Sequence, residues 1–167
     1  MGSAGQTRPG HQDANREMTG FKQPVSVLVV IYTPALDVLL LERAAHPGFW
    51  QSVTGSREGE EALLTTASRE VAEETGIDTA RHRPTDWYLT NTFDIFAEWR
   101  HRYAPGITQN VEHVFGLQLP ARREVTIAPG EHRDWCWMPW QSAAERCFSW
   151  SNRDAILMLP QRLQPGA

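Results

Sequence analysis

Three glutamates, Glu70, Glu73 and Glu74, cluster near the end of the stretch Gly55–Ile77, which reads GSREGEEALLTTASREVAEETGI. Residues three and four positions apart lie on the same face of an α-helix, where like charges repel and destabilise the helix. Hard divalent cations such as Mg²⁺ prefer carboxylate oxygens and would reverse this penalty. The stretch therefore predicts a metal-binding helix, and metal held in this way usually handles phosphate.

A helix over Ala62–Thr75 is expected to position these carboxylates, with Gly76 as its C-terminal stop. Its apolar stripe repeats with helical spacing and consists of Leu64, Ala67 and Val71. At about 100° per residue, Glu70 and Glu74 fall at the border of that stripe. They should therefore lie where the helix meets the rest of the domain, facing a cleft.

The remaining segments predict a sheet with interspersed helices. The valine-rich run Val25–Ile31 is typical of a strand covered on both faces. Helices are expected near Gln141–Arg146 and over Asn152–Leu163, the second with Ser151 as its N-cap. Further strands are predicted over Val38–Glu42, Gln51–Thr54, Trp87–Asn91, Phe93–Glu98, Val111–Leu119 and Asp134–Met138. The pattern favours an α/β (α+β) fold with a mixed sheet between helices.

Length and composition indicate one soluble domain over residues 21–167, after a disordered N-terminal extension, Met1–Gly20. The net charge of −4 argues against binding to a nucleic-acid polymer, although Arg100–Arg102 is locally basic. Cys136 and Cys147 are too few for a disulfide scaffold and are expected to be reduced. No membrane span or export signal is recognisable, which predicts a cytoplasmic protein. Whether it is a monomer or a homodimer stays open.

The stretch Gly55–Ile77 resembles the Nudix box at every defined position. Gly55 is followed by five residues and Glu61, then by seven residues and Arg69-Glu70-Val71, and the box closes with Glu73-Glu74 and Gly76-Ile77. Seven fixed residues at this spacing would coincide by chance in well under one in about ten million positions. The resemblance implies the Nudix fold, a mixed sheet between helices, and hydrolysis of a nucleoside diphosphate linked to another group.

The chemistry of these residue types agrees with the resemblance. Glu70 and Glu74 could bind the same Mg²⁺ cluster, with Mn²⁺ as a possible substitute, and Gly55 would let a backbone carbonyl approach the metal. Glu73 is either a further ligand or the base that activates water. Arg69 is expected to orient a glutamate by ion pairing. A solvated acidic helix and a non-catalytic Nudix binding module are the alternatives, but the full set of glutamates disfavours both.

Other segments resemble the bacterial Nudix enzymes that remove diphosphate from 7,8-dihydroneopterin triphosphate in folate biosynthesis. These segments include Lys22–Ser26, Phe49–Gly55, Arg100–Gly106 and Trp150–Arg153. By this resemblance Glu131, in Pro129-Gly130-Glu131-His132, is a metal ligand from outside the box. The substrate residues implied are Lys22, Arg43, Thr54, Phe93, Asp94, Ile95, Phe96 and Ser149.

Two roles in this set follow from chemistry. Lys22 and Arg43 are suited to phosphate oxygens, and Asp94 could accept two hydrogen bonds from a pterin edge while Phe93 or Phe96 stacks on the ring. The alternative for Phe93 and Phe96 is the alternation of a half-buried strand. A Nudix enzyme for (deoxy)nucleoside triphosphates such as dATP is the alternative function, because guanine and pterin share the same hydrogen-bonding edge.

Overall fold

A computed structural model describes residues 20–165 of the chain. The expected disorder of Met1–Gly20 therefore lies, except for Gly20, outside the described residues. In residues 20–165 no helix is both long and apolar enough to cross a membrane.

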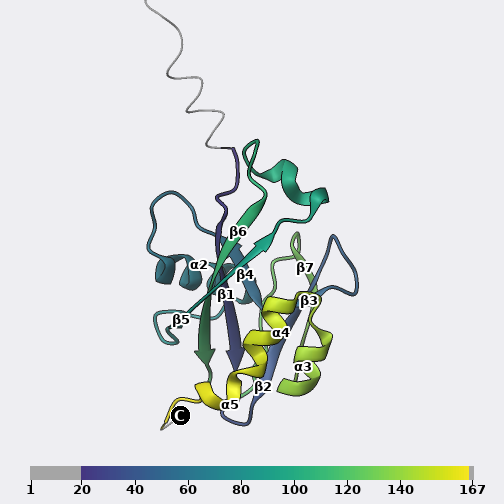
Figure 1. Cartoon of the computed structure of the whole chain (residues 1–167). Helices are drawn as coiled ribbons and strands as arrows, with labels where there is room; N and C mark the ends of the chain where they lie inside the picture. Colours follow the sequence, from purple (N-terminus) through teal and green to yellow (C-terminus); the bar gives the residue numbers. More distant parts are fainter. Residues whose placement is uncertain (1–19, 166–167) are drawn as a thin grey trace, which may run out of the picture.

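A seven-stranded mixed sheet forms the centre of the domain (Figure 1). Its main path runs β3-β2-β1-β6-β5, with β4 paired to β1 and β7 paired to β2. β1 and β6 are parallel, and the other pairs are antiparallel. The strands are β1 (Val25–Tyr32), β2 (Asp37–Arg43), β3 (Trp50–Gln51), β4 (Val53–Ser56), β5 (Thr85–Asp94), β6 (Gln109–Gln118) and β7 (His132–Pro139). The expected mixed sheet between helices is confirmed.

Helices cover both faces of the sheet (Figure 1). On one face lies α2 (Leu63–Thr75), which buries Ala67 and Val71 against β1. On the other face lie α3 (Trp140–Arg146), α4 (Trp150–Leu157) and α5 (Leu159–Arg162). β1 is apolar on both faces because its alternate side chains enter the two separate cores. Gly76 ends α2 in the left-handed conformation, with φ 70°, as its position predicted.

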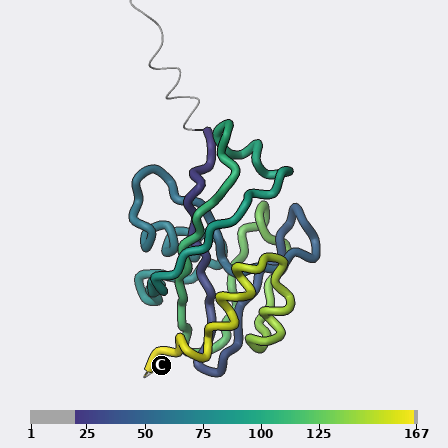
Figure 2. The backbone as a smooth tube through the Cα atoms, viewed as in Figure 1, coloured from purple at the N-terminus to yellow at the C-terminus, as the bar shows by residue number. Residues whose placement is uncertain are grey.

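Several predicted elements differ from the structure. The single strand expected over Gln51–Thr54 is divided at Ser52 into β3, which pairs with β2, and β4, which pairs with β1. Trp87–Asn91 and part of Phe93–Glu98 form one strand, β5, which ends at Asp94 and is followed by a 3₁₀ helix, η1 (Ala97–Arg102). β5 and β6 pair antiparallel, and the segment that joins them, which contains η1, lies at one end of the sheet (Figure 2). The helix expected over Asn152–Leu163 begins two residues early and is divided at Met158 into α4 and α5. Ser149 rather than Ser151 is the N-cap of α4, because Ser149 Oγ accepts from the amide of Asn152.

Candidate active site

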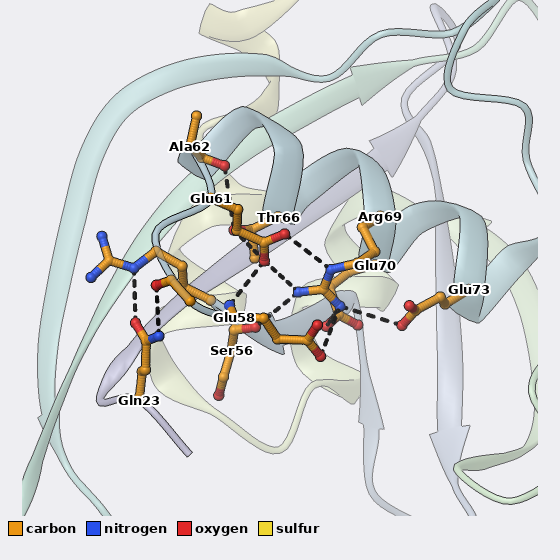
Figure 3. Close-up of polar contacts among 11 residues, drawn as sticks. Gln23, Ser56, Glu58, Glu61, Ala62, Thr66, Arg69, Glu70 and Glu73 are labelled. Atoms are coloured by element: carbon orange, nitrogen blue, oxygen red, sulfur yellow. Dashed lines mark hydrogen bonds and ion pairs between the residues drawn. The ribbon is translucent and has the colours of Figure 1, made fainter. Parts of the chain in front are cut away.

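Arg69, in the middle of α2, lies at the centre of a polar network that joins the helix to the loop before it (Figure 3). Its Nη2 donates to Glu61 Oε1 at 2.6 Å and to the carbonyl of Ser56 at 3.1 Å. Glu61 Oε1 also accepts from the hydroxyl of Thr66 and from the amide of Glu58. We call Arg69, Glu61 and the Ser56 carbonyl the arginine brace. It ties the loop after β4 to the helix.

The brace explains the electrostatics of Glu61. Hydrogen bonds from Arg69 hold the pKa of Glu61 at about 2, and the bonds from Glu58 and Thr66 add to this effect. The same contacts raise the pKa of Arg69 above its usual range. Arg69 was expected to orient a glutamate, and Glu61 is its tightest partner. Its contact with Glu73 is longer, at 3.5 Å, and Glu73 is exposed.

Glu70 lies beneath the backbone of β4. Its Oε1 accepts from Arg69 Nη1 at 2.9 Å, and its side chain is 11% exposed. A Cβ added to Gly55 would lie 2.0 Å from Glu70 Cδ, so the carboxylate occupies the space that any other residue type would need. Gly55 is therefore required for this close approach of a carboxylate to the backbone, a reason that the sequence did not indicate.

Glu74 lies one turn further along α2 and is buried. Its Oε2 accepts from the amide of Thr54 at 3.2 Å. Ligand atoms of Glu74, Glu131 and His132 lie within 4.8 Å of one another, so the loop before β7 brings Glu131 to the helix. Glu70, Glu74 and Glu131 form what we call the acidic cluster.

Burial and mutual repulsion disfavour the negative charges of the acidic cluster. Burial, with smaller contributions from Glu73 and Glu131, raises the pKa of Glu70 to about 7 against the opposing effect of Arg69. Burial, Glu70 and Glu131 also raise the pKa of Glu74 well above its ordinary value. A divalent cation would remove both effects, and carboxylate oxygens are the ligands that hard cations prefer. The residues present therefore fit a divalent metal.

His132 is a feature of this site that the sequence reasoning missed. The residue is buried, and its Nδ1 atom has no hydrogen-bond partner. Burial and the charge of Arg43 lower the pKa of His132 to about 4, so the ring is neutral near pH 7. A neutral imidazole beside carboxylates is a possible further ligand. Its place directly after Glu131 was the available signal.

A broad cavity of about 1530 Å³ opens beside the acidic cluster. Every substrate residue expected from the sequence lines it, as do all four glutamates of the expected metal and catalytic set. The structure therefore brings the expected residues together around one space. The substrate residues are Lys22, Arg43, Thr54, Phe93, Asp94, Ile95, Phe96 and Ser149.

Two cations from early in the chain approach the cavity. Desolvation lowers the pKa of Lys22, and the guanidinium groups of Arg102 and Arg43 lower it further. Arg43 lies 4.9 Å from the ring centroid of Trp99, and its buried Nε has no hydrogen-bond partner. An unpartnered guanidinium nitrogen beside a second cation favours an anionic ligand such as phosphate. Trp99 was not among the expected site residues.

Both expected hydroxyl groups also have structural partners. Thr54 Oγ1 donates to the carbonyl of Val27 in β1, and Ser149 caps α4. Each hydroxyl oxygen can still accept a further hydrogen bond.

The segment Phe93–Phe96 is only partly a strand. Asp94 is exposed at the end of β5 and accepts from Gln109 Nε2 at 3.2 Å. Ile95 is buried, whereas Phe96 is 52% exposed and packs edge-on against Trp99 at 5.0 Å. The expected strand alternation therefore stops at Asp94, and the chain turns so that aromatic rings border the cavity.

Comparisons with known proteins agree with this geometry. The NUDIX domain family matches residues 22–159. A dihydroneopterin triphosphate diphosphatase of Escherichia coli is 47% identical over 139 residues, which cover 81% of this chain and 91% of that protein. A protein of the same name from Haemophilus influenzae is 39% identical over 142 residues, which cover 83% of this chain and 89% of that protein.

The solved structure of the E. coli dihydroneopterin triphosphate pyrophosphohydrolase superposes on this chain with a TM-score of 0.80 and 44% identity. The superposition covers 86% of this chain and 99% of the E. coli chain. The family match spans the sheet, α2, all three residues of the acidic cluster, and α3 and α4 on the opposite face. The chain therefore belongs to the Nudix family.

Proposed function

We propose that this protein hydrolyses 7,8-dihydroneopterin triphosphate to the monophosphate and diphosphate, with Mg²⁺ as the metal. The observation that carries the proposal is the acidic cluster at the edge of a cavity large enough for a pterin and three phosphates. The E. coli and H. influenzae relatives bear the name of this activity, and each aligns with more than four-fifths of the chain. Their similarity supports the choice of substrate within the family.

Glu70, Glu74 and Glu131 are proposed to hold the metal, with the Gly55 carbonyl as a possible further ligand. When bound, Mg²⁺ would neutralise diphosphate oxygens and favour departure of the leaving group. The arginine brace holds Glu70 through the 2.9 Å contact between Arg69 and its carboxylate. Glu73 is exposed on the same helix and is proposed to accept a proton from the attacking water.

Lys22 and Arg43 are proposed to bind the phosphate chain. Both are desolvated and adjacent to a further cation, Arg102, so an anionic ligand would offset the repulsion among them. The aromatic border formed by Phe96 and Trp99 offers faces for a flat ring. Charge and shape therefore support a proposed arrangement in which the phosphates lie toward the acidic cluster and the ring lies toward β5.

Steady-state hydrolysis tests the substrate. The kcat/KM for 7,8-dihydroneopterin triphosphate should exceed that for dATP and dGTP by at least about tenfold, with the monophosphate and diphosphate as products. A higher kcat/KM for either deoxynucleotide would refute the pterin assignment and leave a nucleoside triphosphate pyrophosphohydrolase.

A further inference from the structure

Two nearby residues of β6 each bury a side-chain oxygen that has no hydrogen-bond partner. Glu112 is 5% exposed and Asn110 is 3% exposed, yet Glu112 Oε1 and Asn110 Oδ1 have no hydrogen-bond partner. Both residues line the cavity. A buried polar atom without a partner costs folding free energy unless a ligand or water completes it. These two residues were not among those expected from the sequence.

The two side chains share one face of β6. Residues two apart on a strand lie on the same side, about 7 Å from each other. On that side Asn110 Nδ2 donates to Ser26 Oγ at 2.8 Å, which leaves the oxygen of the amide as the free group. The neighbouring strands contribute Ser26, the partner of Glu112 in β1, and Asn91, its partner in β5.

The surroundings of Glu112 favour a fixed carboxyl group. Burial raises the pKa of Glu112, while hydrogen bonds from Ser151 in α4 and Asn91 oppose that change. These contacts hold the group between the sheet and the start of α4. Oε1 is left as a buried acceptor without a partner on a residue that lines the cavity, beside a second such acceptor on Asn110.

Two adjacent acceptors recognise a ligand edge that carries several N–H donors. A 2-amino-4-oxopyrimidine ring presents its ring N–H and its amino group side by side, which one carboxylate can accept together. A 7,8-dihydropterin carries a further N–H on its second ring, on the same side as the amino group. Guanine lacks this N–H because the corresponding nitrogen bears the sugar. Adenine offers only its amino group along its pairing edge.

We infer that the Glu112 carboxylate accepts hydrogen bonds from the amino-pyrimidine edge of the substrate. Asn110 Oδ1 accepts from the N–H on the second ring of the dihydropterin. This inference deepens the proposed function and rests on it for the identity of the pterin. It moves the edge-reading role from the exposed Asp94 to a buried residue. Asp94 already accepts from Gln109, and water competes for its carboxylate.

The test is Glu112→Gln assayed with 7,8-dihydroneopterin triphosphate, dGTP and dATP in the presence of Mg²⁺. Glutamine has the same shape as glutamate, but its amide N–H₂ is a donor and cannot accept a hydrogen bond from the N–H groups of the ligand. We expect kcat/KM to fall about 10- to 100-fold for the pterin and for dGTP, mainly through KM. The value for dATP should stay within about threefold. Glu124→Gln, an exposed residue outside the cavity, is the matched control.

The outcomes separate the inference from the proposed function. If the wild type does not prefer the pterin, the proposed function fails, while the ratio of dGTP to dATP in Glu112→Gln still tests edge reading. Equal losses for all three substrates would mean a structural role for Glu112 and would overturn the inference, as would no loss at all.

If Glu112→Gln does not fold, Glu112→Asp takes its place. Binding of 7,8-dihydroneopterin without phosphates, followed by fluorescence, should then weaken about tenfold or more, and unchanged binding would overturn the inference.

Discussion

Glu61 and Glu70 lie in the same sequence motif and both contact Arg69, but their electrostatic situations are opposite. In the arginine brace, the pKa of Glu61 falls to about 2 because the guanidinium, a hydroxyl and an amide all donate to it. In the acidic cluster, the pKa of Glu70 rises to about 7 because burial and neighbouring carboxylates outweigh one contact with Arg69. The brace is complete without metal, whereas the cluster needs a cation. One motif thus combines a structural part with a part that is destabilised until it binds.

The largest expected effect comes from removing a charge of the acidic cluster. Glu70→Gln should lower kcat by about three orders of magnitude or more, because the proposed ligand is lost. The fold should survive, since the glutamine keeps the shape of a side chain whose charge is repelled. Steady-state kinetics and a thermal melt of the metal-free protein check both parts. A variant that keeps wild-type kcat would contradict the role of Glu70.

Gly55→Ala should disturb the acidic cluster by steric overlap alone. Gly55 has no positive φ, so the backbone tolerates alanine, but the new Cβ would overlap the Glu70 carboxylate. We expect kcat/KM to fall about 100-fold as Glu70 is displaced. Gly130→Ala is the matched control, because Gly130 borders the same cavity and a Cβ there meets nothing within 4 Å. Equal activities of the two variants would argue against the close approach.

Glu61→Gln should weaken the brace and mainly reduce stability. The ionised carboxylate has its pKa lowered from 4.5 to about 2, which corresponds to roughly 3 kcal/mol of stabilisation. Since the folded pKa is depressed, this stabilisation is present above about pH 4.5 and is lost as the pH falls toward 2. Urea unfolding at pH 7 should show a deficit of about 2–3 kcal/mol for the variant, and the deficit should shrink below pH 4. A deficit that does not change with pH would contradict the ion-pair explanation.

The sequence predicted the chemical part of the site better than its shape. Spacing alone placed Glu70 and Glu74 on one face of α2, and the structure places both carboxylates at a cavity. Helical periodicity depends only on local geometry, so it can be read from the chain. The partner of Arg69 was harder to predict, because Glu61 lies eight residues away and reaches it only when the loop folds over the helix.

The recognition end of the cavity depended on tertiary structure. The end of β5 at Asp94 and the turn into η1 are set by pairing with β6, where Asp94 is opposite Gln109. Asn110 lies just before the strand expected over Val111–Leu119, and Glu112 lies within it without any motif that marks it as a site residue. Their burial and their missing partners arise only when α4 packs on that face. The alternation of a strand does not reveal which polar side chains lack partners.

The most direct test of the contrast between brace and cluster is the thermal stability of the wild type with and without Mg²⁺ at pH 6 and pH 8. The folded pKa of Glu70 lies above its unfolded value, so the metal-free protein should lose stability as the pH rises from about 4.5 through 7. Metal replaces the protons, so the increase in Tm caused by Mg²⁺ should be larger at pH 8 than at pH 6. In Glu74→Gln the increase should be largely abolished at both pH values. A Tm that does not respond to Mg²⁺, or an equal response in the wild type and Glu74→Gln, would contradict a metal-dependent acidic cluster.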